Sequence, residues 1–184
     1  MKKFKKNTKQ FIDIFIRYLI LILVALPGLW IFYFVFTPLT IYPVYFFFGL
    51  FSEVSLIGNI LIINKGLAVE FIRACIAGSA YYLLLILNLS TPKINLIKRI
   101  KIVVLVFALF LFVNLLRILI LIFLFVEGFP YFDAAHEFFW YFMSTLFVVG
   151  IWFAEVKIFK IKEIPFYSDL KFLYKKSFAG KSRK

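Results

Sequence analysis

The chain has 184 residues, of which 64% are hydrophobic, and it carries a formal net charge of +13. A soluble domain of this length cannot bury so much apolar surface, so the composition predicts one integral membrane domain over residues 1–184. A charge of +13 can also indicate nucleic-acid binding. No nucleic-acid-binding motif accompanies it, so we expect no nucleic-acid partner.

The apolar segments predict an all-α membrane fold with about four transmembrane helices. The first is expected at Tyr18–Phe36. The lysine-rich start before it resembles a signal peptide, but the apolar run is too long and no cleavage site follows, so we expect a retained helix that kinks at Pro27 and Gly28. Leu39–Phe51 is too short to span and is expected to be half-inserted or interfacial. The other three helices are expected at Ala74–Leu89, Ile102–Val126 and Ala135–Glu155.

The basic residues give this topology an orientation. With the N-terminus inside and four spans, six lysines and arginines up to Arg17, four in residues 91–101 and nine after Glu155 fall on the cytoplasmic side, which is 19 of the 22. A further full span at residues 42–63 would place the later basic segments on the opposite side of the membrane from this assignment. The distribution of basic residues therefore argues against such a span. We therefore expect a multi-pass protein of the cell membrane with cytoplasmic basic tails, residues 1–17 and 156–184, that are attracted to anionic lipid.

A short extracytoplasmic segment precedes the second expected helix. The sequence "ILIINKGLAVEFI" is typical of two short strands, Ile60–Ile63 and Leu67–Phe71, joined by a Gly-containing turn at residues 64–66. This pattern predicts a β-hairpin that leads directly to the helix carrying Cys75.

Three residues are candidates for chemistry at the outer side. With one Cys and one His, internal disulfides and Cys/His metal clusters are excluded, and we expect no metal or other cofactor. Cys75 and His136 begin the second and fourth helices, and Arg117 lies about 24 Å along the third from Lys101. Taken alone, Cys75 is typical of a small buried hydrophobe and His136 of an interfacial anchor. An arginine between apolar runs indicates a functional site by default.

These residue types suit acyl transfer through a thioester. A nearby cation or base turns a thiol into a nucleophile, Arg117 can stabilise a thiolate or an oxyanion, and His136 can protonate a leaving amine and deprotonate the next nucleophile. The order Cys75, then Asn114-x-x-Arg117, then His136 on successive membrane helices resembles the exosortase/archaeosortase family over about residues 55–155.

The resemblance implies that Cys75, Arg117 and His136 are catalytic. It implies a cysteine-type transpeptidase that cleaves a C-terminal sorting signal of exported proteins, made of a short motif, an apolar helix and a basic end. The compact chain resembles the archaeal branch, for which the implied acceptor is a membrane lipid. The family commonly has Cys-x-Gly, whereas Gly78 here stands one residue later.

Three further residues, Gly78, Asn114 and Asp133, are expected to support the site. Asn114, one turn before Arg117, is expected to hold the guanidinium. Asp133, three residues before His136, is expected to orient the imidazole, with a solvated outer rim as the alternative.

Two other functions fit the same residues. One is a small transporter or channel subunit with Arg117 and His136 along a polar path. The other is an assembly protein whose Arg117 pairs with a carboxylate of its partner.

Overall fold

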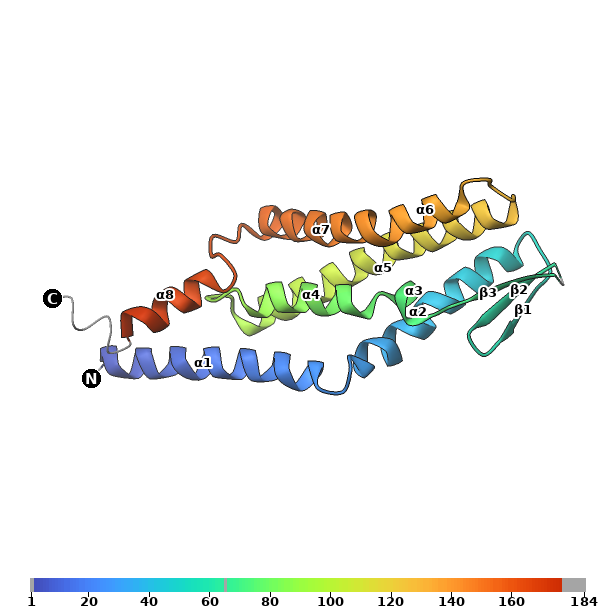
Figure 1. The fold of residues 1–184 in the computed structure, drawn as a ribbon. Coiled ribbons are helices and arrows are strands. Elements are labelled where there is room, and N and C mark those ends of the chain that lie inside the picture. The colour runs from blue at the N-terminus through green and yellow to red at the C-terminus, as the bar shows by residue number, and fades with distance from the viewer. Residues whose placement is uncertain (1, 65, 177–184) are drawn as a thin grey trace.

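A bundle of helices along one long axis carries a small antiparallel sheet at one end (Figure 1). The computed structural model describes residues 2–64 and 66–176. Its helices are α1 Lys2–Ala25, α2 Trp30–Gly49, α3 Arg73–Ile76, α4 Gly78–Leu89, α5 Leu96–Val126, α6 Phe132–Phe138, the π-helical turn η1 Phe139–Met143, α7 Ser144–Phe159 and α8 Tyr167–Lys176. The three strands are β1 Val54–Ile57, β2 Ile60–Ile63 and β3 Leu67–Glu70.

Three helical segments in the described part of the chain are long and apolar enough to cross a membrane, namely Trp30–Gly49, Leu96–Val126 and Phe132–Phe159. Large apolar side chains are exposed along all of them, among them Phe34, Phe112 and Phe153, each at least 60% exposed. A water-soluble bundle would bury such side chains, so the surface is consistent with a membrane protein.

The first predicted helix is wrong in its bounds. α1 ends at Ala25, and Gly28 and Leu29 both have a φ of 61°, a left-handed conformation that breaks the helix instead of kinking it. α2 then continues to Gly49, so the segment predicted to be half-inserted belongs to a helix of spanning length. The two prolines inside α2 are tolerated because packing on its neighbours holds the helix together.

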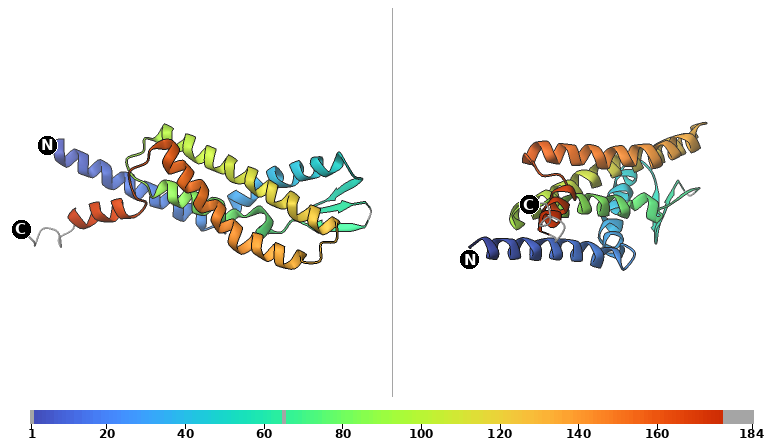
Figure 2. Two further views of the ribbon diagram at one scale, coloured as in Figure 1. Left: turned by 90° about the horizontal axis from the view of Figure 1, so that it is seen from above. Right: turned by 60° about the vertical axis from the view of Figure 1, so that its left-hand side comes forward.

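The chain makes four passes along the bundle axis (Figures 1 and 2). α1 and α2 run end to end toward the sheet, α4 returns, α5 runs out again, and α6 to α7 return. We call the end with the start of α1, residues 90–95 and α8 the basic end, and the opposite end the sheet end.

The second predicted helix is interrupted. Ala77, with a φ of 57°, separates the single turn of α3 from α4. α4 has 12 residues and measures about 18 Å, less than the hydrocarbon thickness of a bilayer. The third and fourth helices lie where the sequence predicts them. α5 begins six residues earlier than predicted and ends at the predicted Val126, and the fourth helical segment is longer at both ends.

The sheet has strand order β1-β2-β3 with both neighbours antiparallel. The predicted hairpin is confirmed as β2 and β3, with Lys65 of its predicted turn outside the described residues. β1 was not predicted. Alternate residues of the sheet pack on α2 and α5, including Leu61, Ile63 and Phe71, which are all at most 3% exposed.

A layer of aromatic rings closes the middle of the bundle. The Phe36 and Tyr81 rings stack with centroids 3.6 Å apart, and Phe110 meets Tyr81 edge to face at 4.8 Å. Phe32 and Phe107 complete the layer through contacts with the same tyrosine. These rings lie in the core cluster shared by α2, α4, α5 and α7, apart from the cluster under the sheet.

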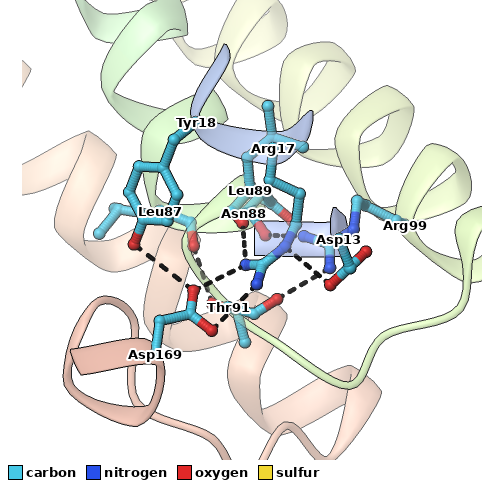
Figure 3. Close-up of polar contacts among 9 residues, drawn as sticks. All are labelled: Asp13, Arg17, Tyr18, Leu87, Asn88, Leu89, Thr91, Arg99 and Asp169. Atoms are coloured by element: carbon cyan, nitrogen blue, oxygen red, sulfur yellow. Dashed lines mark hydrogen bonds and ion pairs between the residues drawn. The ribbon is translucent and has the colours of Figure 1, made fainter. Parts of the chain in front are cut away.

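A buried polar cluster joins α1, α4, α5 and α8 at the basic end (Figure 3). Arg17, only 4% exposed, forms an ion pair at 2.9 Å with Asp169, which is 2% exposed. The same guanidinium bonds to Asp13 at 3.0 Å and to the Leu89 carbonyl at 2.6 Å. Arg99 donates to the Asn88 and Thr91 carbonyls. The last carbonyls of α4 are therefore capped by arginines instead of water.

Candidate active site

The turn between β3 and α4 positions Cys75 at the sheet end. Phe71 is buried under the sheet, α3 makes one turn, and the left-handed Ala77 then redirects the chain into α4. Cys75 is partly buried within this turn. Its carbonyl accepts a hydrogen bond of 2.9 Å from the Asn114 side-chain amide.

This bond corrects the predicted role of Asn114. The amide holds the backbone of the cysteine and not the guanidinium of Arg117. Asn114 is 1% exposed, and its carbonyl oxygen has no hydrogen-bond partner in the described chain. A buried amide of this kind fixes the turn of Cys75 against α5.

Arg117 is buried on α5 without a counter-ion. It is 4% exposed, and its Nη1 donates to Ser144 Oγ at 2.9 Å. Nε has no partner, and no ion pair to Arg117 forms among the described residues. Arg117 and Cys75 line the same cavity. A buried cation with spare donors can stabilise a negative charge that is brought to it.

Ser144 was not singled out from the sequence. Its hydroxyl accepts from Arg117 and donates to the Phe139 carbonyl at 3.1 Å. Residues 139–143 form the π-helical turn, a local widening of a helix that is frequent at functional sites. A single serine in an apolar run is a weak signal in the sequence. Its role depends on lying opposite Arg117, which is on another helix.

His136 is held by aromatic rings on α6. Its ring stacks on Phe132 at 5.9 Å and 13° and lies 5.9 Å from the Trp140 ring. The structure shows no hydrogen bond to its ring nitrogens in the described residues. Asp133 is exposed and does not bond to His136, so the predicted orienting role is wrong and the solvated rim fits.

One cavity brings the three predicted catalytic residues together. It has a volume of about 170 Å³, and its walls include Cys75, Arg117 and His136. β3 and Phe71 form one side, and apolar residues of α5 and α6 form the rest. An apolar cavity of about 150 Å³ holds a benzene ring, so this one has room for a residue-sized group. It offers a thiol, a cation and an imidazole to that group.

Gly78 has a packing role. A Cβ at this position would lie 2.8 Å from Cζ of Tyr33, so the glycine lets α4 approach the tyrosine ring on α2. The Arg73 guanidinium lies over the same ring, 5.2 Å from its centroid. The glycine therefore shapes the region beside the cysteine and contributes no chemical group.

A second cavity of about 330 Å³ is lined in part by Ala74 and Ala77, which flank the turn of Cys75. Its lining includes Tyr33, Arg73, Trp140 and Ser144, the serine that accepts from Arg117. It combines a cationic group at its edge with aromatic and small side chains.

Comparisons with family models, with curated proteins and with solved structures find no match to this chain. Among the described residues no group of three or more His, Cys, Asp or Glu side chains could hold a metal ion. Functional conclusions therefore rest on the residues at the sheet end.

Proposed function

We propose that this protein is a membrane-embedded cysteine transpeptidase of the exosortase/archaeosortase type. One observation carries the proposal: the only cysteine, a buried arginine without a counter-ion and the only histidine line the same small cavity from three separate helices. A cysteine that only packs and a histidine that only anchors at the interface are not expected to line one cavity with a buried arginine.

In the proposed reaction Cys75 Sγ gives its proton to His136 and attacks a peptide carbonyl. The charge on the carbonyl oxygen is stabilised by Arg117. When the C–N bond breaks, His136 returns the proton to the leaving amine and a thioester remains on Cys75. An incoming hydroxyl or amine then loses its proton to His136 and attacks the thioester, which releases the product and regenerates the thiol.

The substrates are proposed to be exported proteins with a C-terminal signal of a short motif, an apolar helix and a basic end. The proposed acceptor is a membrane lipid. The cavity beside Arg73 and Trp140 supports a lipid acceptor, because a guanidinium at its edge suits a phosphate headgroup. The hydrogen bond between Arg117, which lines the cysteine cavity, and Ser144, which lines this one, connects the two cavities.

The proposed orientation puts the basic end in the cytoplasm and the cavity at the extracytoplasmic face. The lysines and arginines of α1, of residues 91–101 and of α8 gather at the basic end, which supports this orientation. Reporters fused after residues 10, 96 and 175 should read inside, and those after 65 and 130 outside. A reporter at 96 that reads outside would reject the orientation together with the site.

The transporter alternative is disfavoured by the aromatic layer. Rings of Phe36, Tyr81 and Phe110 stand between Arg117 and the polar cluster at the basic end, so the buried polar groups form no continuous path. The assembly alternative has one observation in its favour, since the unpaired Arg117 could meet a partner's carboxylate. It does not require the cysteine.

The deciding experiment is co-expression of the full chain with a single-span reporter. The reporter carries a randomised outer segment before an apolar helix and a basic end, and mass spectrometry reads its C-terminus. Cys75→Ala should abolish processing with normal membrane abundance. Arg117→Lys keeps the charge but loses the planar fork and should lower processing severely. His136→Ala should block turnover.

Ser55→Ala, on the exposed face of β1 away from the cavity, is the matched control and should process normally. Processing that continues at the wild-type rate in Cys75→Ala would reject the transpeptidase and favour the assembly protein.

A further inference from the structure

The strand that leads to Cys75 has an unpaired edge. In the order β1-β2-β3 only one side of β3 is bonded within the sheet. Phe71 N–H bonds to the Asn59 carbonyl at 2.9 Å, and Leu61 pairs with Val69 two residues before it. Since bonded pairs alternate along an antiparallel ladder, Val69 bonds to β2.

The main-chain groups of Ala68 and Glu70 must then point away from β2. Within residues 66–76, no hydrogen bond involves the main-chain N–H or C=O of Ala68 or Glu70. In the described chain no helix makes extensive contacts with β3, and α5 and α6 face its edge across the cavity, whereas β1 at the opposite edge contacts α2. Proteins usually cover such an edge or block it with lysine or proline, because it is a template for another strand. β3 is a short strand of four residues that contains neither of these, and Glu70 is its one charged side chain.

The same edge borders the catalytic cavity. Ala68, Val69, Glu70 and Phe71 all line it with Cys75. Four consecutive residues at one cavity include side chains of both faces of the strand, so it is the edge of β3, and not a face, that meets the cavity. The side chains of Ala68 and Glu70 are exposed, and the small alanine leaves room for an incoming chain.

We propose that β3 binds the polypeptide substrate by adding it as a fourth strand of the sheet. An extended segment of the substrate pairs with the main-chain groups of Ala68 and Glu70, and its next residues enter the cavity so that a carbonyl reaches Cys75. Main-chain pairing gives affinity with little demand on sequence, and the 170 Å³ cavity selects the residue that enters it. This inference rests on the proposed function, since it concerns the substrate of that site.

Disulfide trapping tests the pairing without requiring catalysis. The full chain carrying Cys75→Ala and Ala68→Cys is co-expressed with a series of reporters, each with one cysteine in the eight outer residues before its apolar helix. Oxidation should trap the reporter position opposite Ala68 most strongly, trap the positions two residues to either side weakly, and skip the positions between them, since alternate side chains of a paired strand face the same side. Ser55→Cys, exposed on β1 at the other edge of the sheet, replaces Ala68→Cys in the control and should trap none.

A second measurement uses the active chain with the same reporters lacking cysteine. Ala68→Pro removes the outward N–H and leaves the ladder to β2 intact, so it should lower cleavage about tenfold, the effect of one lost hydrogen bond. Abundance in the membrane reports whether this variant folds. If it does not fold, the trapping result decides.

The outcomes separate the inference from the proposed function. Alternate trapping at Ala68→Cys, with none at Ser55→Cys, supports the edge pairing, and cleavage that needs Cys75 supports the enzyme. Cleavage without alternate trapping overturns the pairing and leaves the enzyme standing. Alternate trapping without cleavage supports the pairing and overturns the transpeptidase. The absence of both overturns both.

Discussion

The two carboxylates on Arg17 should differ greatly in their effect on stability, and Asp169→Asn is the informative change. Asp169 is 2% exposed and Asp13 is 55% exposed, although both lie within 3.0 Å of the same guanidinium. With charges about 4 Å apart and an effective dielectric constant of about 20, the buried pair is worth about 4 kcal/mol before desolvation.

Breaking a buried pair costs about 3–5 kcal/mol when the remaining charge is left alone. Arg17 keeps Asp13 and the Leu89 carbonyl after Asp169→Asn, so we expect a loss of about 2–3 kcal/mol. Asp13→Asn should cost less than about 1 kcal/mol, because solvent screens an exposed pair. The asparagines preserve shape in both variants, so the comparison isolates charge and burial.

Hydrogen exchange of α8 in lipid nanodiscs measures the loss, since α8 is held to α1 by this pair (Figure 3). A cost of 2–3 kcal/mol lowers the protection of its amides by roughly 30- to 150-fold, and Asp13→Asn should change it by less than about fivefold. Equal effects of the two variants would refute the argument that burial sets the strength of the pair.

The remaining predictions concern both ends of the bundle. Ser144→Ala removes the one hydrogen bond that Arg117 makes in the described part of the chain and should lower reporter processing at least tenfold, whereas Ser144→Thr should retain most of it. Equal activity of the two would show that the hydroxyl is unimportant. Asn114→Leu removes the hydrogen bond to the carbonyl of Cys75. It should therefore lower stability by about 1–3 kcal/mol in thermal unfolding and should also lower processing. Normal processing would show that this bond does not affect the site. Hydrogen bonds from Lys93 and Ser168 lower the pKa of Glu163. Its contribution to stability is therefore present above the unfolded-state pKa of about 4.3 and is lost as the pH falls through the lower folded-state value. The protection factors of the amides in residues 160–166, corrected for the intrinsic pH dependence of exchange, should fall at acidic pH in the wild type and show no such fall in Glu163→Gln.

The apolar runs and the clustering of basic residues determine much of the architecture by themselves. Both are properties of composition along the chain, and the cost of exposing apolar side chains or of moving lysines across a bilayer does not depend on neighbours. The last two helices and the hairpin before the cysteine follow from these patterns. The candidate triad also follows, because an arginine such as Arg117 stands out between apolar runs in any arrangement.

Tertiary structure decides where helices break and which polar groups meet. The sequence at Pro27 and Gly28 permits either a kink or a break, and the packing of α2 on α4, α5 and the sheet selects the break. Asn114 lies one turn from Arg117 along the helix, yet its amide bonds to a carbonyl on another segment, since a buried donor takes the acceptor that the fold brings near. The ion pair between Arg17 and Asp169 joins residues 152 positions apart. Chain spacing carries no information about such a contact, because it forms only after the helices between them have packed.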